Sequence, residues 1–424
     1  MLAIFLISLF GLVCLGVPIG FSLVGTAVFM MLAQNNIVFL KLAQSFITGV
    51  DSVPLLAIPF FMIAGEIMNK GGISKRIVNF TKVMLGHYRG GLGYVGVVAS
   101  MVFAGITGSA VADTTAIGSV MLPMMKETGY DDKKSTSVIC ASGCIGPIIP
   151  PSTQMIIYGV IAECSISKLF AGGIIPGILM GFALMGLWFF HARKANYPVG
   201  EKASFSEKIK AFKEAILAIM LPVFIIVCIL SGIATATETA AIAVVYALIV
   251  SMFVYKEMSI KEWPSLIIYA CRGTAVMMFV VGAANVAAYL VTTASIPQLL
   301  AQAVLSLTNN PYIFMLLVNL LLVLVGCVMD SGPAIMILAP ILLPIVRQFG
   351  IDPVYFGVVM VCNLCIGLLT PPVGNVLYVG VSLGKIKLFD LIKSMWPFVV
   401  IMYVVLFIIT FFPKLIMFIP NLLG

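Results

Sequence analysis

Hydrophobic residues form long, nearly uninterrupted runs along the whole chain, and short polar segments separate them. Several runs reach the roughly 20 residues that a helix needs to cross the hydrocarbon core of a bilayer. They predict membrane-spanning helices, and the polar segments predict connecting loops and short amphipathic helices. The expected fold is an all-α polytopic membrane protein with about 11 transmembrane helices.

Two stretches, 91–125 and 311–346, differ from simple spans because each is divided near its middle. In 91–125, apolar pieces of about 13 residues flank the small and polar residues 105–115, and each piece reaches only about 20 Å. Such a helix does not cross a core of about 30 Å. Each stretch is therefore predicted to form a re-entrant helical hairpin, with a tip that protein or a water-filled cavity must receive.

Two further runs contain a proline pair. Residues 144–151 read CIGPIIPP and residues 365–372 read CIGLLTPP, so both fit the pattern C-I-G-x-x-x-P-P. Adjacent prolines remove two backbone donors and clash with preceding carbonyls, which ends a helix. The runs 135–162 and 354–383 are therefore predicted to be broken helices.

The two proline motifs are 221 residues apart, and the same offset aligns Gly105 with Gly326 and Asp131 with Asp352. A shared offset at several landmarks indicates an internal duplication. We expect one repeat in 1–211 and another in 212–424, separated near a polar linker that includes an amphipathic helix. Each repeat is predicted to contain scaffold spans, an interfacial arm helix, a hairpin and a broken helix, with the arm helices at 36–50 and near 259–270.

Composition and charge exclude a soluble domain and set the orientation of the chain. Hydrophobic residues make up 62% of the sequence and charged residues only 9%. Twenty of the 24 Lys and Arg residues fall on one side of the predicted threading, which the positive-inside rule makes cytoplasmic. The first hairpin then enters from the cytoplasm and the second from outside, so the two repeats are inverted. Both termini are predicted to be periplasmic.

Inverted repeats with discontinuous helices are typical of secondary transporters, whose sites lie near the middle of the membrane. Each break frees backbone carbonyls and helix N-termini, which can bind ions without a cage of charged side chains. Carbonyl and hydroxyl oxygens suit sodium, and two equivalent clusters suggest at least two ions. The predicted sodium-binding residues are Thr107, Ser109, Gly146, Pro150, Gly326, Asp330, Gly367 and Thr370.

Asp113 and Asp330 are the acidic residues deepest in the predicted hairpins. A carboxylate inside the membrane is costly, which favours a function, although each could instead cap a helix N-terminus. The two are not equivalent, because the 221-residue offset aligns Asp330 with Ser109. No transition-metal site is expected, since no His lies near the closely spaced cysteines Cys140 and Cys144 or Cys362 and Cys365. No other cofactor is expected either. Other titratable residues are predicted to be solvated or to reach an interface: Glu66, Glu238, His87, His191, Arg272 and Arg347.

Four segments together resemble the large permease subunit of TRAP (tripartite ATP-independent periplasmic) transporters. They are 105–115 (GITGSAVADTT), 146–152 (GPIIPPS), 330–333 (DSGP) and 369–375 (LTPPVGN). The resemblance covers essentially the whole chain. It implies sodium-coupled, elevator-type import of a carboxylate solute, of the sialic acid or C4-dicarboxylate type, across a bacterial inner membrane.

The resemblance also implies partners and a solute site. A periplasmic solute-binding protein would deliver the solute, and a small four-helix membrane subunit, expected as a separate chain, would complete the permease; no nucleic acid is expected as a partner. The residues expected to bind the solute are Ser109, Asp113, Ser152, Thr153, Ser331, Gly374 and Asn375.

Three other functions share some of the features expected of a TRAP permease. A different sodium/anion symporter, working without a binding protein, would share the inverted hairpins. A channel fits less well, because two closed hairpins that meet broken helices indicate an occluded site. An intramembrane aspartyl protease using Asp113 and Asp330 is the enzyme alternative, but the G-x-G-D motif of those enzymes is absent. The chain is therefore not expected to be an enzyme.

Overall fold

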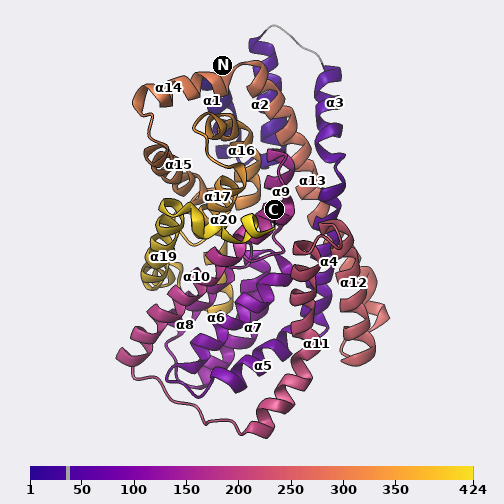
Figure 1. Ribbon diagram of the computed structural model, residues 1–424, viewed down its shortest axis with the longest axis vertical. Helices are drawn as coiled ribbons and strands as arrows, with labels where there is room; N and C mark the ends of the chain where they lie inside the picture. Colours follow the sequence, from indigo (N-terminus) through magenta and orange to yellow (C-terminus); the bar gives the residue numbers. More distant parts are fainter. Residues whose placement is uncertain (35–38, 424) are drawn as a thin grey trace.

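The computed structural model describes residues 1–34 and 39–423, and within them the chain is helical, with one isolated β-bridge between Arg89 and Val199 (Figure 1). Seven helices in this part are long and apolar enough to cross a membrane. Many large apolar side chains point outward, among them Phe182 and Phe21, as expected for faces that contact lipid. The predicted fold class, an all-helical polytopic membrane protein, is confirmed.

The first half of the chain contains α1 (Leu2–Cys14), α2 (Ile19–Ala33), α3 (Phe39–Val50), η1 (Val53–Leu56), α4 (Ala57–Lys70), α5 (Ile73–Leu85), α6 (Gly91–Thr107), α7 (Ala110–Glu127), α8 (Asp132–Gly143), α9 (Thr153–Ala162) and α10 (Ile166–Lys194). The second half contains α11 (Phe205–Leu230), α12 (Ala236–Ile249), η2 (Val250–Val254), η3 (Ile260–Glu262), α13 (Trp263–Thr293), α14 (Ile296–Leu307), α15 (Pro311–Gly326), α16 (Ser331–Gln348), α17 (Pro353–Gly367), α18 (Asn375–Gly384), α19 (Leu388–Phe411) and α20 (Pro413–Leu422).

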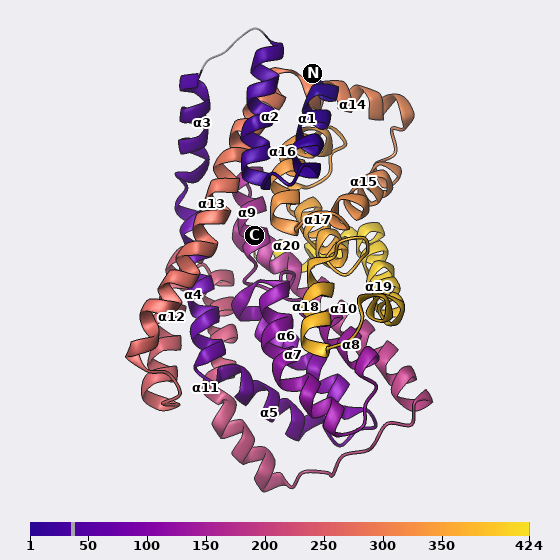
Figure 2. The same cartoon turned by 180° about the vertical axis from the view of Figure 1, so that it is seen from behind.

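One group of helices forms a scaffold along one side of the molecule. Here α2 packs against α13, and α4 packs against both α12 and α13. The arm helix α3 also lies along α13, as both views show (Figures 1 and 2). The α2–α13 and α12–α4 contacts are the same contact under the 221-residue offset, since α2 aligns with α12 and α4 with the second part of α13.

The hairpins and broken helices form a second group, in which the two halves of the chain exchange partners. The first hairpin, α6 and α7, packs against α8, and the second hairpin, α15 and α16, packs against α17. The helix that follows each break contacts the hairpin of the other half: α9 packs against α16, and α18 packs against α7 (Figure 2). Each hairpin therefore touches both broken helices.

The bases of the two hairpins lie at opposite ends of α10. Near its last turn, Trp188 Nε1 donates to the carbonyl of Gly90, directly before the first hairpin, at 2.8 Å. Just ahead of its first turn, Arg347 from the end of the second hairpin donates to the carbonyl of Ala162 at 3.1 Å. Since α10 has 29 residues and a length of about 43 Å, the hairpins enter from opposite ends of the molecule (Figure 1).

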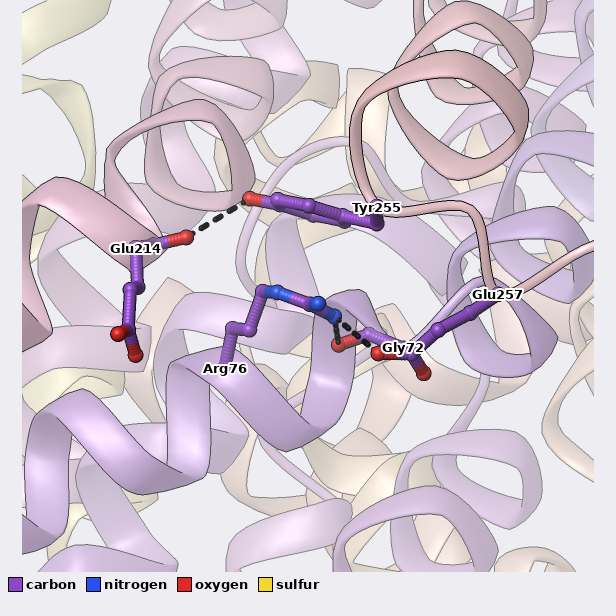
Figure 3. A network of polar contacts seen from close by, with 5 residues as sticks. All are labelled: Gly72, Arg76, Glu214, Tyr255 and Glu257. Carbon is purple, nitrogen blue, oxygen red and sulfur yellow. Dashed lines mark hydrogen bonds and ion pairs between the residues drawn. The ribbon is translucent and has the colours of Figure 1, made fainter.

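A polar network joins α5, which leads into the first hairpin, to the scaffold (Figure 3). Arg76 on α5 forms an ion pair with Glu257 at 2.7 Å and also donates to the carbonyl of Gly72 at 3.0 Å. Its guanidinium lies 3.7 Å from the ring centre of Tyr255, whose hydroxyl donates to the carbonyl of Glu214 on α11 at 3.0 Å. Arg76 thus connects α5 to the segment that follows η2, and Tyr255 extends the network to α11.

Several sequence-based boundaries were wrong. The arm helix predicted near 259–270 and the next span form one continuous helix, α13, because residues 272–275 contain no proline where the first half has Pro54. The polar linker continues into a span as α11, so residues 211 and 212, the predicted limits of the two repeats, lie inside one helix. The C-terminal helix α20 was not predicted. The prediction for the arm helix at 36–50 falls partly outside the described residues.

Candidate functional site

The tip of the first hairpin is held by side chains of its own residues. α6 ends at Thr107, Gly108 takes a left-handed conformation with a φ of 57°, and Ser109 caps α7. The Thr107 hydroxyl donates to Oδ1 of Asp113, in the first turn of α7. Asp113 is fully buried, and its Oδ2 has no hydrogen-bond partner in the part of the chain that the structure describes. The tip thus presents an unpaired carboxylate oxygen to the interior.

This tip lies directly against the first break. The Thr153 hydroxyl, at the start of α9, donates to the carbonyl of Gly108 at 3.1 Å. A Cβ at Gly108 would lie 2.7 Å from the carbonyl oxygen of Pro151, so only glycine fits here. A Cβ at Gly146 would collide with Oδ2 of Asp113. The structure therefore brings the unpaired Asp113 oxygen to the backbone of the break.

The first break runs from the end of α8 at Gly143 to the N-cap of α9 at Ser152. The Ser152 hydroxyl donates to the carbonyl of Pro147 and accepts from the backbone N–H of Met155 at 3.2 Å. Ser152 is therefore occupied in shaping the break. Pro150 contributes its carbonyl, which lies 3.3 Å from the position of a Cβ at Gly105 on α6.

The second tip and the second break are equally close. A Cβ at Gly367 would lie only 2.6 Å from Cα of Gly326, so two backbones meet where each lacks a side chain. The N–H of Val373, just past the proline pair, donates to the carbonyl of Cys327 at 3.1 Å. The Thr370 hydroxyl bonds back to the carbonyl of Ile366 at 3.1 Å. These contacts hold the break onto the hairpin tip.

Asp330 and Asp113 have different environments. Asp330 is exposed and accepts from the N–H of Ser331 at 2.6 Å, so it caps α16. Asp113 is buried and accepts instead from a side chain of its own tip. The capping alternative therefore describes Asp330 and does not describe Asp113.

Sequence reasoning missed Gln154, which joins the two tips. Its Nε2 donates to the hydroxyl of Ser331 at 3.3 Å, and its Oε1 accepts from the hydroxyl of Thr153 at 2.9 Å. Thr153 has one hydroxyl proton, which can go to Gln154 Oε1 or to the Gly108 carbonyl, so one chain of polar contacts runs from the first tip to the second through alternative hydrogen bonds. The only signal in the sequence was a polar amide in an otherwise apolar helix.

The structure places the remaining predicted solute residues, Gly374 and Asn375, at the end of the second break. Gly374, with a φ of 55°, precedes α18, and Asn375 is its first residue. None of the described contacts joins Gly374 or Asn375 to the first tip. The two predicted clusters are thus centred on Asp113 and on the Gly326–Gly367 contact.

The chemistry of the first cluster fits a hard cation better than a transition metal. Its groups are carboxylate, hydroxyl and backbone carbonyl oxygens, and one carboxylate oxygen is both buried and unpaired. Over residues 1–34 and 39–423 no group of three or more His, Cys, Asp or Glu is placed to hold a metal ion. A sodium ion beside Asp113 would supply the positive charge that balances the buried carboxylate.

Known proteins resemble the chain over nearly its full length. The family described as "Tripartite ATP-independent periplasmic transporter, DctM component" matches residues 6–415. A putative TRAP transporter large permease of Haemophilus influenzae is 45% identical over 98% of this chain and 97% of its own. The 2,3-diketo-L-gulonate TRAP transporter large permease of Escherichia coli is 43% identical over 97% of each chain. The sialic acid TRAP transporter large permease of Vibrio cholerae is 38% identical over 97% of this chain and 96% of its own.

A solved structure shows the same fold. The YdaH transporter of Alcanivorax borkumensis, whose topology is described as unusual, superimposes with a TM-score of 0.65. The superposition covers 88% of this chain and 87% of that one, at 14% sequence identity. At this identity the likeness concerns the arrangement of helices alone.

Proposed function

Because the chain belongs to the DctM component family, the large permeases of TRAP transporters, we propose that it couples sodium entry to the import of a carboxylate solute. The solute is of the sialic acid or C4-dicarboxylate type. The permease resides in the inner membrane with both termini in the periplasm, receives the solute from a periplasmic binding protein, and works with a small four-helix subunit.

One observation carries the sodium part of this proposal: each hairpin tip is closed onto a broken helix, and the first closure leaves a buried carboxylate oxygen unpaired. A buried anionic oxygen without a partner is costly, and a bound cation removes that cost. Sodium then stabilises the closed tip, which links ion binding to the shape of the solute site. The Gly326–Gly367 contact provides the equivalent closure in the second half.

An elevator movement is the second part of the proposal. The hairpins and broken helices contact one another extensively, and they meet the scaffold through fewer elements, including α4 against α6 and α13 against α16. We assign α6–α10 and α15–α19 to the moving unit and α1–α4 with α11–α13 to the scaffold. Exchange of conformation between inverted halves would then open the site to either side.

A disulfide across this boundary tests the movement. A Cβ at Gly65 on α4 would lie 3.5 Å from Cβ of Thr107, within the range for a disulfide. We expect Gly65→Cys with Thr107→Cys to form a disulfide under oxidising conditions and to stop uptake, and reduction should restore uptake to the level of the Thr107→Cys single variant, which lacks the hydroxyl that bonds to Asp113. The exposed Cys14 and Cys271 are replaced by serine, and each single cysteine variant serves as a control. Full uptake by the oxidised pair would contradict a movement at this boundary.

The whole function is tested by uptake into proteoliposomes that contain the permease and its small subunit, with the binding protein added outside. An inward sodium gradient should drive saturable uptake, and removal of sodium or of the binding protein should abolish it. Uptake that persists without the binding protein would favour the other type of sodium/anion symporter. Unsaturable flux would indicate a channel.

A further inference from the structure

A small cavity separates the first hairpin tip from the scaffold. Its volume is about 70 Å³, enough for a few water molecules. Thr107, Ser109 and Thr153, which belong to the tip and the first break, line one side. Three polar residues line the scaffold side, Glu66 and Asn69 from α4 and Tyr269 from α13. Two of the predicted solute residues, Ser109 and Thr153, therefore face a scaffold wall that sequence reasoning did not include.

Glu66 brings a negative charge to this wall. It is partly buried, and within the described ranges it forms no hydrogen bond and no ion pair. Lys70, one turn further along α4, is exposed and does not line the cavity. The sequence-based expectation that Glu66 is simply solvated at a span end was therefore incomplete, because its helix places it beside the tip.

The tip side of the cavity is also rich in hydrogen-bond acceptors. The Thr107 hydroxyl uses its proton on Asp113, and the Thr153 hydroxyl uses its proton on the Gly108 carbonyl or on Gln154. The Thr107 oxygen also accepts from the N–H of Ser109 at 3.3 Å, so each threonine oxygen still has a lone pair that a donor on a ligand could use. A ligand placed here meets acceptors from Glu66 and from both threonines, and a ligand group that donates protons satisfies them best.

We propose that Glu66, Asn69 and Tyr269 form the scaffold wall of the solute site and select monocarboxylates that carry hydroxyl groups, the sugar-acid class, over dicarboxylates. Hydroxyl groups donate to Glu66 and to the threonine oxygens, whereas a second carboxylate placed there would face a like charge. A six-carbon sugar acid exceeds the cavity, so in this conformation only its hydroxyl-bearing end fits. This inference rests on the proposed function and narrows its solute.

The test measures sodium-driven uptake of gluconate and of succinate by the complete transporter, as wild type and as Glu66→Gln. Wild type should prefer gluconate, because Glu66 repels the second carboxylate of succinate. The neutral amide removes this repulsion and should reduce the gluconate-to-succinate uptake ratio. We expect a change of roughly tenfold, because Glu66 is partly hydrated and water weakens its repulsion of another charge. The control is Glu127→Gln, the same chemical change at an exposed position away from the cavity. Tyr269→Phe, which removes one hydroxyl, should lower gluconate uptake and leave succinate uptake unchanged.

The outcomes separate this inference from the function on which it rests. Sodium-driven uptake in which succinate is preferred, or in which Glu66→Gln leaves the ratio unchanged, overturns the inference and leaves the transporter proposal standing. A variant that changes only the sodium concentration for half-maximal uptake would show that Glu66 holds a cation, which also overturns it. Absence of sodium-driven uptake across a panel of sugar acids and dicarboxylates would overturn both.

Discussion

Replacing Gly367 by alanine tests the backbone contact at the centre of the proposed second ion site. The new Cβ would lie 2.6 Å from both Cα and the carbonyl carbon of Gly326. An ordinary contact needs at least about 3.4 Å, so α15 and α17 would have to separate by close to 1 Å. Overpacking of this kind costs about 1–3 kcal/mol, because the obstructing atoms are backbone and no side chain can turn away.

Gly332 offers a matched control in the same hairpin. A Cβ there meets nothing within 4 Å, and the residue lies in the first turn of α16. Gly332→Ala should therefore be neutral or stabilise the helix by about 0.5–1 kcal/mol. The two variants carry the same chemical change at nearby positions, so their difference isolates the close approach of the two backbones.

The measurement compares thermal unfolding of the purified permease in detergent, with and without sodium, and sodium-driven uptake in liposomes. Gly367→Ala should unfold at a lower temperature than Gly332→Ala and gain less from sodium. If about 2 kcal/mol of this cost falls on the sodium-bound, closed tip, the sodium dissociation constant rises roughly 30-fold, which a sodium titration resolves easily. If Gly367→Ala were as stable as the control and equally responsive to sodium, the backbone contact would have no role in holding the site.

Two further variants probe the first tip and the attachment of α5. Asp113→Asn should keep the hydrogen bond from Thr107 but remove the charge, so the sodium concentration for half-maximal uptake should rise at least tenfold; Asp51→Asn, at an exposed acid, is the control. Arg76→Gln should lose about 1 kcal/mol, since it removes a partly buried ion pair and the contact with Tyr255, whereas the exposed Lys75 can be replaced by Gln without loss. Equal sodium dependence in the first pair, or equal thermal stability in the second, would contradict these assignments.

The breaks could be predicted from sequence because their cause is local. Pro150, Pro151, Pro371 and Pro372 cannot donate backbone hydrogen bonds, and this holds whatever surrounds them. The helices end before both pairs: α17 stops at Gly367, four residues ahead of Pro371, and α8 stops at Gly143, seven residues ahead of Pro150. The all-helical fold was predictable for a similar reason, since long apolar runs have few other stable forms in a membrane.

The hairpin tips were less predictable, because their extent depends on tertiary contacts. The sequence placed the polar tip between two half-length helices at residues 105–115, and in the structure the helices extend into this segment, α6 to Thr107 and α7 from Ala110. Several polar side chains in this segment bond within the hairpin and leave the helices intact: Thr107 donates to Asp113, and Thr115 donates to the carbonyl of Val111 one turn earlier, while α7 packs against α8. The polarity of individual residues does not reveal these tertiary contacts.

The partners of the site residues were beyond sequence reasoning. Gln154 and Ser331 are 177 residues apart, and Glu66 reaches the tip only because α4 lies beside α6. The duplication aligned the halves but did not reveal that α9 packs against the hairpin of the opposite repeat. Contacts between a broken helix of one repeat and the hairpin of the other depend on how the two repeats pack together, and the sequence of a single segment does not show that packing.

Under the sodium coupling proposed above, the chain of polar contacts from Gly108 through Thr153 and Gln154 to Ser331 would affect how tightly the two ion sites are linked. With only one of two ions bound, one tip would be closed on its ion and the other would be free to move. Movement of the second tip alone would break a hydrogen bond in this chain. The shared bonds therefore disfavour crossings with a single ion aboard. Under that coupling, the amide of Gln154, which joins the two tips, would suppress the transport of one sodium ion without the second.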